Sequence, residues 1–260
     1  MKKTIIAAAM LAASFGAAQA ADLPARMITK APPLAVVYDW TGFYIGGNAG
    51  SASLHKCFQT ERVGAIAVVG VRDDGCHNGW GPTAGGQIGY RWQTGTWVWG
   101  LEAQGNWANI RGESRSVFFG PPFSNRSHVD ALGLFTGQIG YAVYNALFYM
   151  KGGAAVTRDT YEGFATAPGF GSVPFAAFDR ATETRWGGTV GVGLEFGWAP
   201  NWTAGIEYNH LFLGSRGNSF NATAAPAGIS RVTRIEQDVD LFLLRLNYRF
   251  GWSAAGVARF

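Results

Sequence analysis

Apolar and polar side chains alternate with a period of two in eight separate segments of the chain. The segments span roughly residues 40–50, 83–93, 97–107, 129–142, 146–157, 184–197, 202–212 and 237–250. Such alternation places successive side chains on opposite faces of a strand. Each segment is close to the ~9–11 residues that a tilted strand needs to cross a bilayer. The pattern therefore predicts eight β-strands of membrane-crossing length.

The connections between these segments alternate in length. Residues 93–96, 144–145 and 199–201 are short turns, whereas 51–82, 108–128, 158–183 and 213–236 are long, polar and rich in Gly, Ser and Pro. Short turns on one side and long loops on the other are typical of an outer-membrane barrel, and nothing in a soluble sandwich requires them. We predict an all-β fold, an eight-stranded antiparallel transmembrane β-barrel over residues 40–250, with short periplasmic turns, long extracellular loops and both termini in the periplasm.

The faces of the strands support this prediction. In segment 97–107, Trp97, Trp99 and Leu101 share one face, and Glu102 and Gln104 lie on the other. Segments 184–197, 202–212 and 237–250 divide in the same way, with large apolar residues opposite small or charged ones. The apolar face would contact lipid and the polar face would line the lumen.

The hairpin turns predict how neighbouring strands align. A two-residue turn at 144–145 pairs Val143 with Ala146 and places Gln138 opposite Lys151. A four-residue turn at 93–96 pairs Trp92 with Trp97, Tyr90 with Trp99 and Gln87 with Glu102. In both hairpins polar residues meet polar ones, as a fixed register requires.

The polar faces carry an unusual set of charges. Three glutamates each directly follow a Gly-Leu or Gly-Ile dipeptide, and four basic residues lie on the same face of the strands. The full set is Arg91, Glu102, Lys151, Glu195, Glu207, Arg245 and Arg249. The lumen of an eight-stranded barrel is just wide enough for side chains to fill, so these charges must be paired or hydrated. We expect Glu102, Lys151 and Glu207 at similar depth. The network is interpreted as a structural plug, with a narrow gated path for ions or solutes as the alternative.

Catalysis by these carboxylates is disfavoured because basic partners should keep them ionised. A hydrolase or acyltransferase at the rim would need a Ser and a His, and Ser127, His128, Asp130 and His210 are the candidates. Adjacency in sequence does not establish the geometry of a triad. We therefore predict no enzyme activity, no catalytic residue and no bound cofactor.

Two cysteines, Cys57 and Cys76, occur in the first long connection. In an exported protein a disulfide between them is the expected state. The alternative is a metal- or haem-binding loop in which His55 and His77 complete four ligands, although the spacing is not that of a zinc motif. We predict the disulfide and no metal site.

The ends of the chain lie outside the alternating pattern. Residues 1–3 include two lysines, residues 5–13 are small and apolar, and residues 18–20 form a small-x-small cleavage site. These features predict that residues 1–20 are a signal peptide that is cleaved before Ala21. Residues 21–39 contain three prolines and are predicted to be a periplasmic arm. Residues 251–260 form an extension that ends, like the last strand, in Phe.

Composition narrows the class further. Lys and Arg number 21 against 17 Asp and Glu, without a basic cluster, so nucleic acid is not an expected partner. Glycine occurs 37 times without the strict three-residue period of collagen. Glycine and aromatic residues in short alternating runs instead favour curved strands.

Several motifs resemble those of one family. "ADLP" after the cleavage site, "YDWTGFYIGGNAG" at 38–50 and "LNYRF" at 246–250 look like the small outer-membrane immunogenic or porin-family β-barrel proteins of alphaproteobacteria. "LFYMKGGAA" and "VGVGLEFG" are similar to internal strands of that family. The resemblance covers essentially the whole exported chain.

The resemblance implies a monomer-sized barrel in the cell outer membrane, with surface loops recognised as antigens and a role in envelope integrity. Expected partners are outer-membrane lipid, lipopolysaccharide and the barrel-assembly machinery, which recognises a C-terminal aromatic. Tyr248 and Phe250, or Phe260 on a shifted strand, are the candidates for that signal. The alternatives are a narrow porin and a loop that binds haem, metal or a host surface.

Overall fold

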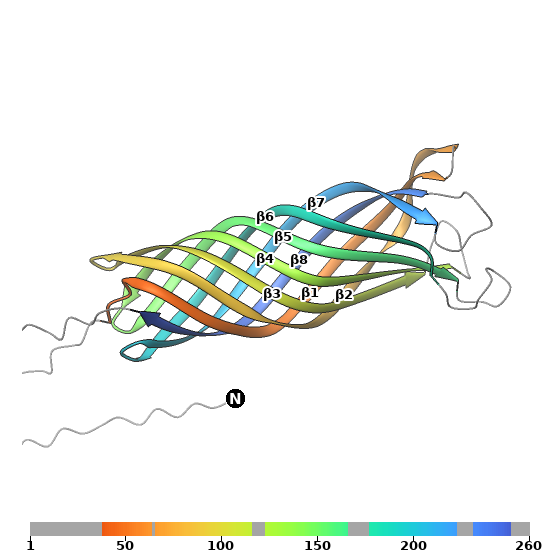
Figure 1. Cartoon of the computed structure of the whole chain (residues 1–260). Helices are drawn as coiled ribbons and strands as arrows, with labels where there is room; N and C mark the ends of the chain where they lie inside the picture. Colours follow the sequence, from red (N-terminus) through yellow and green to blue (C-terminus); the bar gives the residue numbers. More distant parts are fainter. Residues whose placement is uncertain (1–37, 64–65, 116–122, 166–176, 223–230, 251–260) are drawn as a thin grey trace, which may run out of the picture. The chain divides into compact units, whose positions relative to one another are not determined.

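The computed structural model describes residues 38–63, 66–115, 123–165, 177–222 and 231–250. These residues form eight strands: β1 (Gly42–Val63), β2 (Ile66–Thr94), β3 (Trp97–Arg115), β4 (Phe123–Val143), β5 (Ala146–Ala165), β6 (Ala177–Ala199), β7 (Trp202–Ala222) and β8 (Arg231–Phe250). Each strand pairs antiparallel with its sequence neighbour, and β8 pairs with β1 to close the barrel (Figure 1). The predicted fold class is confirmed. Within the described residues, no helix is long and apolar enough to span a membrane.

The outward face has the pattern of a lipid-facing wall. Large apolar side chains point outward in the middle of the strands, including Ile88, Leu101, Phe135, Met150, Val192, Ile206 and Leu244. Aromatic side chains border this band near the short turns, at Trp92, Trp97, Trp99, Tyr141 and Trp202, and again farther along the strands, at Trp80, Trp107, Trp186 and Phe212. Two aromatic girdles around an apolar band mark the two interfaces of a membrane.

The strands continue well beyond the outer girdle. β1 runs to Val63 and β2 starts at Ile66, so most residues that the sequence analysis placed in the long connection 51–82 are paired strand. The connections 108–128, 158–183 and 213–236 are likewise largely strand. Outside the bilayer the outward face of a strand meets water and carries polar residues. The inward face stays buried and mixes apolar side chains such as Leu54 with charged ones such as Lys56, which removes the alternation that marks the membrane part.

One predicted register is confirmed and one is corrected. Val143 pairs with Ala146 and Gln138 with Lys151, as the 144–145 turn predicts. In the β2–β3 hairpin, Thr94 pairs with Trp97 and Gln87 with Gln104, two positions away from the prediction. The turn contains two residues rather than four, because Gly95 adopts a positive φ of 62° that closes it tightly. A shift of two positions preserves the face of every side chain, so Glu102 still points inward.

Candidate functional site

Four charged side chains from four strands meet in the lumen. Lys151 Nζ on β5 lies 2.8 Å from Glu102 Oε1 on β3 and 2.8 Å from Glu207 Oε1 on β7. The guanidinium of Arg245 on β8 bonds the second oxygen of each carboxylate. All four side chains are buried, so the cluster is a closed square of two cations and two anions. The expected common depth of Glu102, Lys151 and Glu207 follows directly from these contacts.

A second ion pair lies beside the square. Arg91 Nη2 is 2.8 Å from Glu195 Oε2, and both side chains are buried. Glu195 Oε1 also accepts hydrogen bonds from Asn247, at 2.9 Å, and from Thr203. The guanidinium of Arg91 lies 4.5 Å from the centre of the Tyr44 ring, within the range of a cation–π interaction.

Two tyrosines complete the network, and the sequence analysis did not identify them. The Tyr44 hydroxyl donates to Glu102 Oε2 at 2.7 Å, and the Tyr149 hydroxyl donates to Glu207 Oε2 at 2.6 Å. Both tyrosines are buried although their neighbours Phe43 and Phe148 are exposed. Strand alternation contains this signal, because it places Tyr44 and Tyr149 on the inward face.

Arg249 was predicted to join this network, and that prediction is wrong. Its guanidinium donates to the backbone oxygens of Thr41, at 2.8 Å, and Pro200, at 3.0 Å, and lies 3.7 Å from an oxygen of Asp39. Arg249 lies near the end of β8 at the periplasmic turns, where backbone carbonyls are free to accept. It therefore binds the mouth of the barrel instead of the square.

The chain before β1 closes this mouth. Trp40, expected to begin the first strand, instead precedes it and is 1% exposed. Its backbone N–H donates to Gln93 Oε1 at 2.9 Å, and its ring lies 4.7 Å from the ring of Tyr38. The two aromatics pack in one cluster with Val98, Ala142, Leu147 and Tyr149. The end of the arm is thus an apolar cap inside the periplasmic opening.

An apolar layer crosses the lumen on the other side of the charges. Between the two lie buried amides, among them Asn48, Gln87 and Asn106, which are hydrogen-bonded to one another. Among the described residues, the layer consists of Ala52, Leu54, Ala108, Ile110, Val129, Leu132, Leu134, Ala155, Leu211, Leu213, Val239, Leu241 and Leu243. None of these side chains is more than 4% exposed, so the layer is packed and dry.

A second polar layer follows in the outer part of the strands. Lys56 Nζ is 2.8 Å from Asp159 Oδ1, and both side chains are fully buried. Gln237 and Thr157 also donate to Asp159, and Arg185 donates to the backbone oxygen of Ile235 at 2.9 Å. The sequence analysis missed Lys56 and Asp159, because they fall in stretches without clear alternation.

The rim residues considered for catalysis do not form a triad with Ser127. Ser127 is buried and its Oγ lies 2.8 Å from Nε2 of His77, whereas His128 lies on the other face with its Nε2 2.7 Å from Asp130 Oδ1. His210 contacts Asp240 at 2.7 Å. Desolvation, reinforced by Lys56, lowers the pKa of His77 to about 4, so its imidazole is neutral at physiological pH.

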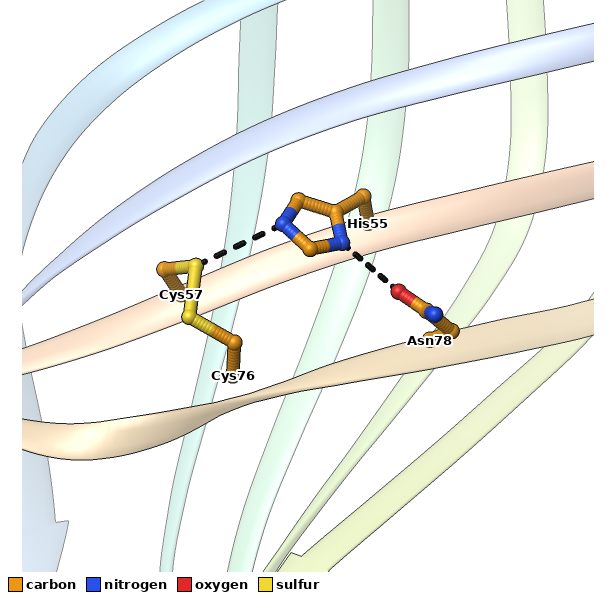
Figure 2. The surroundings of a disulfide bond; sticks show 4 residues. All are labelled: His55, Cys57, Cys76 and Asn78. Carbon is orange, nitrogen blue, oxygen red and sulfur yellow. Dashed lines mark hydrogen bonds between the residues drawn. A yellow bond between two sulfur atoms is a disulfide. The ribbon is translucent and has the colours of Figure 1, made fainter.

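The cysteines face each other across β1 and β2 on the outward side. Cys57 Sγ and Cys76 Sγ are joined at 2.04 Å, and His55 lies on the same face (Figure 2). His77 lies on the opposite, inward face and stacks on Phe58, with ring centres 5.2 Å apart. The four-ligand arrangement considered from the sequence is therefore not formed.

The C-terminal aromatics lie at the closing strand pair. Phe250 is the last residue of β8 and pairs with Phe43, and the Tyr248 ring lies 5.1 Å from the ring of Trp202. Phe260, the extension 251–260, the signal peptide with its cleavage site before Ala21, and most of the arm 21–39 lie outside the described residues.

A closed, even-numbered antiparallel barrel with an apolar outer band, two aromatic girdles and a filled lumen is the architecture of an outer-membrane β-barrel protein. The chain belongs to the outer membrane protein β-barrel domain family, whose profile matches residues 6–250. It is thus a protein of the cell outer membrane, and the family resemblance noted in its motifs is confirmed.

Curated relatives agree with this assignment. The chain is 30% identical over 271 residues to the 31 kDa outer-membrane immunogenic protein of Brucella melitensis biotype 1, an alignment that covers 96% of this chain and 100% of the relative. The protein of the same name from Brucella suis biovar 1 is similar to the same extent. Among solved structures, the outer membrane protein OprG from Pseudomonas aeruginosa is 10% identical, with 82% of this chain and 98% of OprG covered at a TM-score of 0.48.

Proposed function

We propose that this protein is a sealed barrel with a structural role in the outer membrane and an exposed, antigenic outer surface. The apolar layer across the lumen carries this proposal. A hydrated ion would have to lose its water among Leu54, Ile110, Leu211 and Leu241, where the neighbouring hydroxyls of Thr83 and Thr189 already donate to backbone oxygens. Hydrophobic constrictions of this kind close pores by dewetting.

The charge network below that layer supports a structural role as well. Each oxygen of Glu102 and Glu207 already accepts a hydrogen bond or ion pair from Lys151, Arg245 or a tyrosine. The positive charges of Lys151 and Arg245 hold both carboxylates in the ionised form, which weakens them as proton acceptors. The network therefore fits a scaffold that fixes strand positions better than it fits a general base, and we propose that the protein is not an enzyme.

The outer surface indicates the partners. The apolar band would contact lipid. Arg126, Arg158 and Arg234 lie beyond the outer girdle, where they would face the phosphates of lipopolysaccharide. The barrel-assembly machinery would recognise the end of β8 at Tyr248 and Phe250, after a signal peptide is removed before Ala21. A closed barrel completes its own strand pairing, so we propose a monomer. The Brucella relatives carry the name immunogenic, and the outer ends of the strands would be the corresponding antigenic surface here.

Single-channel conductance in planar bilayers tests the sealed barrel. Three proteins are compared: the wild type, Glu102→Gln, which breaks the charge square, and a triple variant Ile110→Ala, Leu211→Ala, Leu241→Ala, which thins the apolar layer. We expect no stable open steps from the wild type or from Glu102→Gln, because both retain the apolar layer. The triple variant should conduct.

Large, stable open steps in the wild type would contradict the proposal. Open conductance steps in Glu102→Gln, together with no conductance in the triple variant, would instead support the alternative, a narrow pore gated by the charge square. Heat-dependent migration in gel electrophoresis shows that each variant is a folded barrel.

A further inference from the structure

Three potential metal ligands converge on the outer wall of the β1–β2 hairpin, beyond the outer girdle. One ligand atom from each of His55, Cys57 and Cys76 lies within 4.8 Å of the other two. In the structure the two sulfurs form a disulfide, and His55 Nε2 lies 3.6 Å from Cys57 Sγ (Figure 2). His55 and Cys76 are exposed and Cys57 is half-buried, so reagents in solution reach the group.

The orientation of His55 is set by Asn78. Nδ1 of His55 is 2.6 Å from Asn78 Oδ1 on the neighbouring strand (Figure 2). With the Asn78 amide oriented as in the structure, its oxygen only accepts hydrogen bonds, so in the neutral imidazole Nδ1 carries the proton and Nε2 holds a lone pair. That lone pair points toward the sulfur of Cys57, which has no S–H group in a disulfide. Metal-binding histidines are oriented in this way, with the second ring nitrogen donating to a fixed oxygen.

We propose that this group is a redox-gated zinc site, in which His55, Cys57 and Cys76 bind Zn²⁺ once the disulfide is reduced. A thiol reductant attacks the disulfide, and two thiol molecules leave as their own disulfide while Cys57 and Cys76 each gain an electron and a proton. Zn²⁺ then displaces both thiol protons and binds two thiolates and the imidazole, with water in the fourth position.

The fold suits such a site. Zinc holds sulfur and nitrogen at about 2.3 and 2.0 Å, which sets neighbouring ligand atoms roughly 3.5 Å apart. The His55 Nε2 to Cys57 Sγ distance already has this value, and breaking the S–S bond lets the second sulfur move to a similar separation. All three ligands and Asn78 lie on paired strands, which hold them more rigidly than a loop would. The disulfide and the metal are therefore alternative states of the same residues.

Cobalt binding to the folded protein in detergent micelles tests the proposal. Co²⁺ is the probe, because coordination by thiolate gives it a charge-transfer absorption band that other ligands do not give, and Zn²⁺ then competes for the site. The wild type is measured oxidised and after reduction by a phosphine, alongside reduced His55→Ala, Asn78→Ala and His128→Ala. His128→Ala is the matched control, since His128 is a histidine on the same outer wall that pairs with Asp130.

The reduced wild type should bind one Co²⁺ per chain with the thiolate band, and the oxidised protein should bind none at this site. Asn78→Ala should weaken binding about 10–100-fold, as loss of a group that orients a ligand does, and His55→Ala should weaken it further. His128→Ala should match the wild type.

Two results would overturn the inference. The first is a reduced, folded protein with two titratable thiols that shows no thiolate-to-cobalt band. The second is equal affinity in wild type and His55→Ala, which would mean that the cysteines bind metal without the proposed site. Heat-dependent gel migration separates either result from loss of the fold.

Discussion

Lys151 neutralises two carboxylates at once, since Glu102 and Glu207 both lie 2.8 Å from its ammonium. Arg245 completes the square, and Tyr44 and Tyr149 supply the neutral donors. Buried ions of this kind are stable only as a complete set, because a single unpaired charge costs several kcal/mol. The stability of the lumen therefore depends on every member of the square.

Removal of Lys151 should be strongly destabilising. Lys151→Met keeps most of the side-chain volume but leaves two buried carboxylates facing the single guanidinium of Arg245. We expect the free energy of unfolding to fall by about 3–5 kcal/mol, measured by urea titration in lipid vesicles. Addition of Glu102→Gln to this variant should recover part of the loss.

Met150→Leu is the control for that measurement. Met150 is the preceding residue and points to lipid, where Leu is an equivalent side chain. A loss below about 1 kcal/mol in Lys151→Met would show that water hydrates the lumen and that the square is not a dry ion cluster.

Alternation in the sequence predicted which charges point inward but not all of their partners. Glu102, Lys151, Glu207 and Arg245 share a face in the pattern, and they share the square in the structure. Tyr44 and Tyr149 were not predicted, because an aromatic residue in a membrane strand suggests an interfacial girdle. Their positions in the alternation, however, indicate the inward face. Arg249 points into the lumen, as the alternation predicts, but lies nearer the mouth of the barrel than the charge square does. The depth of a residue depends on how neighbouring strands are staggered, and the sequence of a single strand does not contain this information.

At the scale of the strand, the register depends on turn conformation. The β2–β3 turn is closed by Gly95 at a φ of 62°, a left-handed conformation that costs other residues about 1–2 kcal/mol. The sequence pattern predicts the position of this turn but not its length. The predicted pairing of β2 with β3 was therefore wrong by two residues, with Gln87 opposite Glu102 instead of Gln104. The β4–β5 turn, with only Tyr144 and Asn145 between apolar strands, left no such ambiguity.

Substitution of Gly95 tests this dependence. A Cβ at Gly95 would meet no atom within 4 Å, so Gly95→Ala is penalised by backbone conformation alone. We expect the free energy of unfolding to fall by about 1–2 kcal/mol in urea titrations. Gly105→Ala is the matched control, because Gly105 is also unobstructed but lies in β3 without a positive φ. Equal effects of the two substitutions would refute a special role for the turn conformation.

The lengths of the strands were less predictable than their faces. Within the lipid, the outer face must be apolar, and this requirement produces the alternation. Beyond the outer girdle the requirement ends, and residues such as Lys56 and Asp159 are strand without a sequence signal. The membrane part of each strand was therefore predictable, and the outer part was not.

The lumen is filled at two levels, by the cap at the periplasmic mouth and by the apolar layer nearer the outer side, and we propose that the apolar layer alone excludes ions. The cap depends on Trp40, which is buried among Tyr38, Val98 and Leu147. The two seals are formed by different residues and lie on opposite sides of the charge network. Loss of the cap should therefore affect stability without opening the barrel.

Trp40→Ala tests this separation of the two seals. We expect a loss of about 3–5 kcal/mol in the free energy of unfolding, as for other buried aromatic side chains, and no stable open steps in planar bilayers. Trp198→Ala, which removes an exposed tryptophan near the short turns, should cost less. Open steps in Trp40→Ala would show that the cap, and not the apolar layer, seals the barrel.

The pairing of β1 with β8 has a consequence for how the barrel forms. Phe43 meets Phe250 across the closing pair, and Arg245 on β8 meets Glu102, which lies 143 positions earlier in the chain. An open sheet of the first seven strands would hold Glu102 and Glu207 with only one of their two cations. Arrival of the last strand thus completes hydrogen bonding at both edges and neutralises the interior in the same event. A misaligned closure would leave Arg245 without its two carboxylates, so the charge square favours the correct alignment of β8 with β1.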